Sequence, residues 1–217
     1  MNAIKLQRLQ VVSKERAINL PRPLLAHLGL AWCLFVAFQL DWLRPPLLPF
    51  LIFNTDIFIA VLKQELAPWY LTALVGYGYM HASFIHITLN SVWLAAVGTP
   101  VLEQLGWFRL TILMWLGSGA GAAAFAFNNM YTSPNLVGLS AAVSALFGAF
   151  VRLPMPGRIS PLPLLDTKVT RFSIGFLLLH VVLAVIIPPG FENVAWDAHI
   201  AGFLIGLLLV PIFLKRP

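Results

Sequence analysis

The stretch VGLSAAVSALFGAF, residues 137–150, is apolar apart from two serines and two glycines. If it forms a helix, Ser140, Ser144 and Gly148 share one face, because residues four apart lie one turn apart. In a membrane, a face of small residues lets a neighbouring helix approach closely. The stretch therefore predicts a tightly packed membrane helix. It leaves open whether either serine has a chemical role.

The composition of the whole chain is that of a membrane protein. Of the 217 residues, 59% are hydrophobic and only 10% are charged, and the mean hydropathy is +0.85. Soluble proteins carry about 25% charged residues. We expect an all-α integral membrane domain over residues 24–214, preceded by a short basic cytosolic arm, residues 1–23, without the apolar region of a cleavable signal peptide. Six runs have about the length that a helix needs to cross a bilayer, roughly residues 24–42, 85–101, 108–127, 137–153, 171–188 and 197–214.

The basic residues are distributed unevenly between the loops that join these runs. If six spans alternate in direction, twelve of the fourteen lysines and arginines fall on one side, and only Arg44 and Lys63 fall on the other. The cytoplasmic side of a membrane protein carries the excess of basic residues. We therefore expect both termini in the cytoplasm, and the net charge of +6 does not indicate nucleic-acid binding. The single cysteine, Cys33, lies inside the first run, so no disulfide is expected.

Residues 43–84, between the first two runs, have an unusual composition for a loop. They are too apolar for a solvated connection, and their four prolines interrupt them too often for a span. Trp42 and Trp69 suit the membrane–water interface, where an amphipathic ring is stabilised. The segment therefore predicts a re-entrant or interfacial structure that is embedded in the membrane and packed against the bundle.

Three clusters of polar residues open the second, fourth and sixth spans, which all run from outside to inside. They are HASFIHITLN (81–90), GLSAAVS (138–144) and WDAHIAGFLIG (196–206). Each lies within about two turns of the outer end, so all three are expected at a similar depth. Ionisable groups inside a membrane are costly and by default indicate function or pairing inside the bundle. Small residues on spans four and six, among them Gly202 and Gly206, predict close packing that brings His199 next to Ser140.

This arrangement predicts the chemistry of a serine nucleophile. A serine hydroxyl needs a base to take its proton, and histidine is the usual base near neutral pH. The resulting oxyanion needs donors aimed at it, which His86, Asn90 and the backbone N–H of Ser140 could provide. Asp197 is two positions from His199, points elsewhere around the helix, and is expected to cap the helix N-terminus.

Each cluster taken alone has an ordinary structural interpretation. A lone serine in a membrane helix is usually a packing residue, a His–Asn pair is usually an interhelical hydrogen bond, and a histidine with glycines below it usually marks helix packing. We interpret the coincidence of all three at one depth as a site. His81 is expected to hydrogen-bond near it. Residues without such neighbours are interpreted as structural, namely Ser83, Ser91, Ser118, Ser144, His27, His180 and Cys33.

The ordered motifs resemble those of the rhomboid family of intramembrane serine proteases over roughly residues 64–212. HASFIHITLN is similar to the family pattern H-x4-H-x3-N, GLSA lies where the family has G-x-S-G, and AHIAGFLIG is similar to A-H-x-x-G-x-x-x-G. GTPVLEQLGWFR (98–109) and PWYLTALVGYGYMHAS (68–83) resemble the regions beside the second span. The resemblance implies a six-helix bundle with a membrane-embedded first external loop. It also implies a Ser140–His199 dyad, oxyanion stabilisation by His86 and Asn90, and supporting roles for His81, Gly138, Gly202 and Ser144.

The chain departs from the family pattern at four positions. Ala141 replaces the second glycine of G-x-S-G and is expected to add a methyl where spans four and six are closest, and Ala201 adds similar bulk on span six. Ser144 stands where many members carry an aromatic ring that stacks on the catalytic histidine. Tyr70 follows Trp69 where an arginine is frequent, which implies a different anchoring of the first loop.

We therefore expect an intramembrane serine endopeptidase of a bacterial inner membrane that cleaves transmembrane protein substrates near the outer boundary. Its partners are expected to be those substrates and membrane lipid, not nucleic acid, and no cofactor or metal is expected. The main alternative is a catalytically impaired rhomboid-like protein that binds membrane clients. A transporter would need charged midplane residues or inverted repeats, which are not visible. A zinc protease would need H-E-x-x-H, which does not occur.

Overall fold

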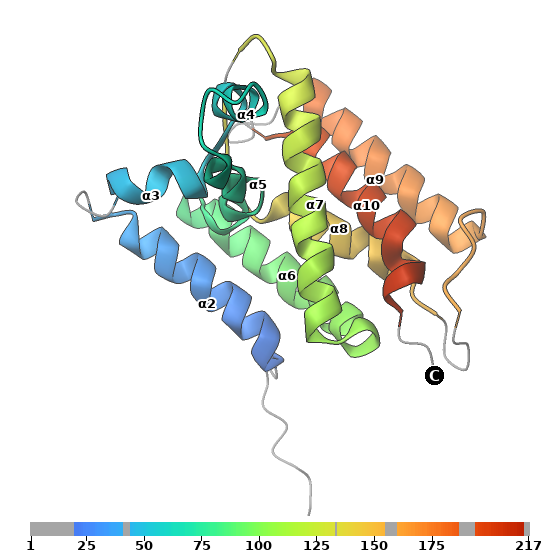
Figure 1. Cartoon of the computed structure of the whole chain (residues 1–217). Coiled ribbons are helices and arrows are strands. Elements are labelled where there is room, and N and C mark those ends of the chain that lie inside the picture. Colours follow the sequence, from blue (N-terminus) through green and yellow to red (C-terminus); the bar gives the residue numbers. More distant parts are fainter. Residues whose placement is uncertain (1–19, 41–43, 133, 155–159, 187–193, 215–217) are drawn as a thin grey trace, which may run out of the picture.

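The computed structural model describes residues 20–40, 44–132, 134–154, 160–186 and 194–214, and Figure 1 shows their arrangement. Most of the predicted basic arm and Trp42 lie outside the described residues. Each of the six predicted ranges overlaps one helix, and together these helices form a bundle. They are α2 (Arg22–Ala37), α6 (Phe84–Leu105), α7 (Trp107–Asn128), α8 (Ser140–Val151), α9 (Thr167–Ile186) and α10 (Trp196–Phe213).

Three of these helices, α6, α7 and α10, are long and apolar enough to cross a membrane. Their bounds differ from the predicted ranges by at most four residues. The helices α2 and α8 are apolar but shorter. At 1.5 Å per residue, the twelve residues of α8 reach only about 18 Å, less than the roughly 30 Å hydrocarbon core. The predicted range 137–153 is therefore too long at both ends.

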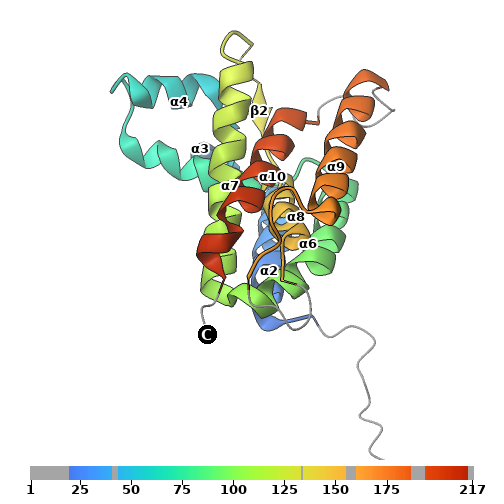
Figure 2. The ribbon, with the colours of Figure 1, turned by 90° about the vertical axis from the view of Figure 1, so that its right-hand side faces the viewer.

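The short helix α8 occupies the centre of the bundle, where α6, α7, α9 and α10 contact it (Figures 1 and 2). Nine of its twelve residues are buried. A helix that is apolar all round is stable when other elements cover every face. Alanine, glycine and serine account for seven of the twelve residues, and their small size lets several helices reach α8 at once.

Glycines set the contact between α8 and α10. A Cβ atom added at Gly202 would collide with the backbone of Ala141, and one added at Gly206 would collide with the backbone of Ala145. On α8, a Cβ at Gly148 would meet the carbonyl oxygen of Phe203. The two backbones therefore touch directly, as the small residues of these two segments predict.

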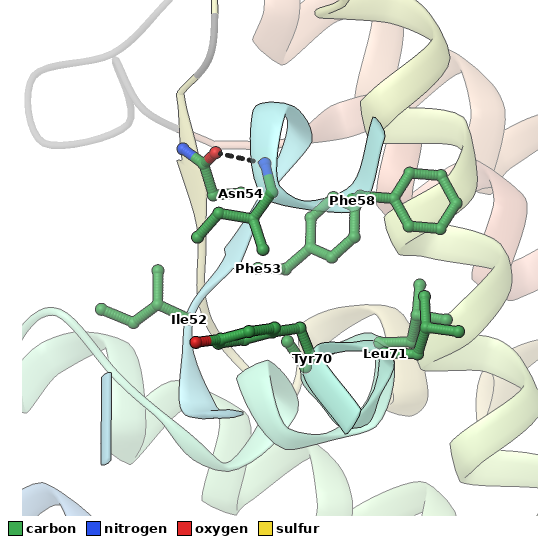
Figure 3. A pocket seen from close by; sticks show the side chains of 9 residues that line it. Ile52, Phe53, Asn54, Phe58, Tyr70 and Leu71 are labelled. Atoms are coloured by element: carbon green, nitrogen blue, oxygen red, sulfur yellow. Dashed lines mark hydrogen bonds between the residues drawn. The ribbon is translucent and has the colours of Figure 1, made fainter. Parts of the chain in front are cut away.

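Short pieces of structure replace a continuous helix between α2 and α6. They project to one side of α7 (Figure 2) and comprise α3 (Arg44–Leu51), β1 (Phe53–Asn54), α4 (Thr55–Leu62), η1 (Pro68–Thr72), α5 (Ala73–Gly76) and η2 (Tyr77–Tyr79). The Asn54 side chain caps α4 by accepting from the N–H groups of Asp56 and Ile57 at 3.0 and 3.2 Å, and Figure 3 shows the second of these bonds. Tyr70 stacks on Phe50, with ring centroids 6.1 Å apart, and so joins η1 to α3.

A small two-stranded ladder departs from the expected all-helical structure. β1 pairs antiparallel with β2 (Asn135–Leu136), so that Phe53 faces Leu136 and Asn54 faces Asn135. Phe53 is 2% exposed and packs against Tyr77 and Phe125. The ladder thus ties the segment after α2 to the residues that lead into α8.

Arg152 secures the opposite end of α8. It is 8% exposed, and its guanidinium donates to the carbonyl oxygens of Leu162 at 2.9 Å and Leu207 at 2.6 Å. The Leu207 carbonyl lacks its usual helical donor, because residue 211 is proline and has no N–H. One buried cation therefore satisfies the carbonyl that Pro211 leaves free in α10.

Candidate active site

Ser140 is the first residue of α8, and the backbone just before it is tightly constrained. The N–H of Gly138 donates to the carbonyl oxygen of Tyr77 at 2.9 Å, and the N–H of Leu139 donates to Nε2 of His81 at 3.4 Å. Gly138 has a φ of +116°, in the region that favours glycine. The chain therefore makes a sharp turn just before Ser140. Two hydrogen bonds stabilise this turn, one to Tyr77 of η2 and one to His81, two residues after η2.

His86 and Asn90, one turn apart on α6, lie beside this turn. A Cβ added at Gly138 would fall 2.6 Å from Nε2 of His86 and 3.8 Å from Nδ2 of Asn90. The ring of His86 also lies 5.0 Å from that of His81. Ser83 caps α6 by accepting from the His86 N–H at 3.2 Å, which agrees with its structural interpretation. Gly138 thus makes room for the two residues predicted to stabilise an oxyanion.

His199 lies in the first turn of α10, beside the contact between α10 and α8. Gly202 lies three residues after His199 on α10. A Cβ added at Gly202 would collide with the backbone of Ala141, the residue that follows Ser140. The structure therefore gathers the three polar clusters at one end of the bundle.

The aromatic environment of His199 differs from that expected. Its ring makes edge contacts with Trp196 and His180, with centroids 5.8 and 5.3 Å away. Ser144, at the position where many rhomboids carry a stacking ring, is 6% exposed and lies inside the bundle. Rings from α9 and from α10 itself therefore surround the histidine.

His180, interpreted from sequence as structural and without partners, contacts the candidate site directly. Its Nε2 lies 3.2 Å from Nδ1 of His199. A signal for this contact was present in the sequence. A histidine inside an apolar helix of a membrane protein needs a polar partner, and His180 lies in the C-terminal half of α9. Its partner is on another helix, so spacing along the chain did not identify it.

Asp197 joins α10 to α7 and does not contact the His199 ring. Its carboxylate accepts from the N–H of Ala198 at 2.7 Å and from Nδ2 of Asn128 at 3.2 Å. The residue at the N-cap position is Ala195, so the expectation that Asp197 caps the helix was wrong by two positions.

The methyl group of Ala141 does not lie where it was expected. The contact with α10 is made by the Ala141 backbone against Gly202, whereas a Cβ added at Gly121 on α7 would lie 2.7 Å from the Ala141 Cβ. Ala141 is 1% exposed and belongs to a cluster that includes Tyr77 and Ala198. The second glycine of the family motif is therefore replaced without separating α8 from α10, because Gly121 leaves space on α7.

This packing predicts a compensating pair of substitutions. Gly121→Ala is expected to destabilise the protein by roughly 1–3 kcal/mol, because its added methyl overlaps that of Ala141. Ala141→Gly in the same chain is expected to recover part of that loss, although it weakens helix propensity by about 1 kcal/mol. Thermal unfolding of the two single variants and the double variant in detergent would measure the coupling. Additive losses would contradict the proposed contact.

Two of the other polar residues interpreted as structural, His27 and Ser91, make contacts that fit that interpretation. His27 on α2 bonds the Tyr79 hydroxyl at 2.8 Å and the Thr111 hydroxyl at 3.0 Å. Ser91 accepts from Nε1 of Trp32 at 3.1 Å. These bonds join α2 to η2, α7 and α6, away from Ser140.

A polar cavity opens beside the N-terminal end of α10. It has a volume of about 300 Å³ and is lined by the ends of α7 and α10 and by β2. Asn128, Asn135 and Asp197 contribute polar groups, and Trp196, which contacts His199, forms part of its wall. In the described ranges, no group of three or more His, Cys, Asp or Glu residues has the arrangement of a metal site.

Comparison with known proteins places these features in a family. A sequence model described as the Rhomboid domain matches residues 68–216. RHOMBOID-like protein 5 of Arabidopsis thaliana is 25% identical over 156 residues, which cover 72% of this chain and 47% of that protein. RHOMBOID-like protein 1 of the same plant is 28% identical over 163 residues, or 75% of this chain and 38% of that protein. Rhomboid protease GlpG of Serratia proteamaculans (strain 568) is 27% identical over 139 residues, or 62% of this chain and 45% of that protein. The matched part spans less than half the length of each of these relatives.

Proposed function

Because this chain belongs to the rhomboid family, we propose that it is an intramembrane serine endopeptidase with a Ser140–His199 dyad. Its substrates are transmembrane proteins, cleaved near the outer membrane boundary. The observation that carries this proposal is the packing on either side of Ser140: the turn at Gly138 lies against His86 and Asn90, and the Ala141 backbone lies against Gly202, three residues after His199. The name of the Serratia relative, a rhomboid protease, agrees with it.

The chemistry proceeds in two stages. The Ser140 hydroxyl attacks the scissile carbonyl carbon while His199 takes the hydroxyl proton. The tetrahedral intermediate collapses as His199 delivers that proton to the leaving amine, and an acyl-enzyme on Ser140 remains. Water, deprotonated by His199, then attacks the ester and releases the carboxylic acid and the serine. The polar cavity supports this step as a source of water, because Trp196, which contacts His199, forms part of its wall.

The oxyanion of each tetrahedral intermediate needs donors that are already in place. The N–H groups in the first turn of α8 have no partner within the helix, and the helix dipole favours negative charge there. His86 and Asn90 lie against the turn at Gly138 and are the side-chain donors in this proposal. His81 supports the arrangement by accepting from the Leu139 N–H.

The protein is a multi-pass membrane protein. We further propose that all six helices span or enter the membrane as one domain, residues 24–214, with residues 1–23 as a cytosolic arm. The distribution of Lys and Arg supports cytoplasmic termini, and a bacterial inner membrane is the proposed location. In this proposal the segment from α3 to η2 is the membrane-embedded first loop, substrates and lipid are the partners, and neither cofactor nor nucleic acid is required.

The second candidate function is that of a catalytically impaired rhomboid that binds membrane clients. Ala141 and Ser144 are the residues that favour it. Against it, the Ala141 methyl is accommodated at Gly121, and His199 has ring contacts and a hydrogen-bond partner despite the small Ser144. These contacts favour an active enzyme.

A fluorophosphonate probe distinguishes the active protease from the impaired client-binding protein, because it reacts covalently with an activated serine. We expect the wild-type protein to be labelled, Ser140→Ala to lose labelling completely, and Ser144→Ala to keep at least about half of it. Ser144→Ala is the matched control, since it removes a hydroxyl one turn away on the same helix. Absence of labelling in the wild type, or labelling that persists in Ser140→Ala, would contradict the proposal.

A further inference from the structure

His180 connects the backbone of α9 to the candidate base on α10. Its ring is 7% exposed. Nδ1 of His180 lies 2.8 Å from the carbonyl oxygen of Phe176, one turn earlier on α9, and Nε2 lies 3.2 Å from Nδ1 of His199. Two consecutive hydrogen bonds thus link a backbone carbonyl to the imidazole that would activate Ser140.

The chemistry of the donors and acceptors assigns a direction to these bonds. A carbonyl oxygen only accepts, so Nδ1 of His180 must carry its hydrogen. In a neutral imidazole the other nitrogen is then an acceptor, so Nε2 of His180 accepts from Nδ1–H of His199. His199 is therefore left with an unprotonated Nε2, which is the nitrogen available to take a proton from serine.

We propose that His180 is a positioning residue that holds His199 in the Nδ1–H tautomer, with Nε2 free to accept the Ser140 proton. The inference rests on the proposed function, because it assigns His180 a role in the same reaction. When His199 becomes charged during catalysis, Nε2 of His180 continues to accept from Nδ1–H. The orientation of the base then depends on an acceptor from another helix, a role that an aspartate fills in Ser-His-Asp enzymes.

The ring of His180 is held in place by its own neighbours. Phe176 lies 4.1 Å from it between centroids, and Trp196 makes an edge contact at 5.5 Å. Phe176 is in turn stacked on Phe203 of α10, at 4.3 Å. These aromatic contacts restrict rotation of His180, and a fixed acceptor is what a fixed tautomer of His199 requires.

The hydrogen bonds of the Asp197 carboxylate go to residues other than His199. Both of its oxygens are engaged, one by the Ala198 N–H and the other by Asn128. Among the residues that the structure describes, His180 is the hydrogen-bond partner of the His199 ring. The acceptor for the base therefore comes from α9.

Two substitutions of His180 distinguish the loss of its hydrogen-bond acceptor from the loss of its aromatic packing. His180→Phe keeps an aromatic ring against Phe176 but removes the acceptor, and we expect kcat to fall roughly 10- to 100-fold with KM changed less than about twofold. His180→Gln restores an oxygen acceptor and is expected to recover most of the lost kcat. The matched control is His27→Phe, which removes a histidine whose two hydrogen bonds go to Tyr79 and Thr111 and not to His199, and its kcat should stay within about twofold.

A spectroscopic measurement tests the tautomer without relying on activity. The histidines of the Ser140→Ala variant are labelled with ¹⁵N, because this variant is expected to fold but not to cleave substrate. In its NMR spectrum we expect Nδ1 of His199 to be protonated and Nε2 to be unprotonated. In the same background, His180→Phe should produce a mixture of tautomers. Protonated Nε2 in the Ser140→Ala protein would overturn the inference, as would unchanged kcat in His180→Phe or equal losses in His180→Phe and His180→Gln. Cleavage that survives Ser140→Ala would instead reject the proposed function and leave the tautomer result standing.

Discussion

Cleavage of a transmembrane substrate by His199→Gln is expected to fall at least about 10³-fold. Glutamine keeps a polar side chain of similar reach, but its amide cannot take the proton of the Ser140 hydroxyl near neutral pH. Loss of the base in serine proteases removes most of the catalysis. The measurement is kcat on a reconstituted substrate in proteoliposomes, with thermal unfolding to confirm that the variant folds.

The dyad also predicts how this substitution combines with Ser140→Ala. Residues that act as one catalytic unit are strongly non-additive, so the double variant should be no slower than the slower single variant. Ser91→Ala, a half-buried change on α6 that removes a structural hydroxyl, should retain kcat within about threefold. Losses that multiply in the double variant would indicate independent roles for the two residues.

Gly206→Ala is expected to give the largest loss of stability among single-methyl changes. The added Cβ would collide with the carbonyl of Ala145, and backbone cannot rotate away as a side chain does. We expect a loss of about 3 kcal/mol or more, at the upper end of overpacking effects. For a chain of this size, that corresponds to a fall in Tm of roughly 10 °C. Thermal unfolding in detergent micelles measures it.

Gly119→Ala on α7 is the matched control, because a Cβ added there meets no atom within 4 Å. Its Tm should not fall, since alanine favours a helix over glycine by about 1 kcal/mol. Equal Tm values for Gly206→Ala and the wild type would show that α8 and α10 are further apart than the structure has them.

The helices were predictable because each depends on local composition. Long apolar runs specify α6, α7 and α10 within four residues at either end. α8 was harder, since its twelve residues are shorter than a span and its start depends on the turn at Gly138. The ladder between β1 and β2 was not predicted, because two residues on each side provide no periodic pattern and pair across more than eighty positions.

The candidate site, like the fold, could be predicted from the sequence only in part. Sequence motifs near the N-terminal ends of α6, α8 and α10 predicted Ser140, His199, His86 and Asn90 as site residues, and the structure brings these motifs together. Their catalytic roles remain predictions. His180 was missed, because its partner is on another helix. The position of the Ala141 methyl was also wrong, because one sequence cannot say which neighbour faces each side of α8.

The amino-acid sequence alone therefore determined the membrane class, the helical segments and the residue types available for catalysis, since hydrophobicity and motif spacing are properties of the chain itself. Only the tertiary structure decided that the Ala141 methyl faces Gly121 and that His199 hydrogen-bonds His180. Those contacts depend on how helices rotate and approach one another. Rotation and approach follow from packing of the whole bundle, in which one methyl or one hydrogen bond decides between neighbouring arrangements.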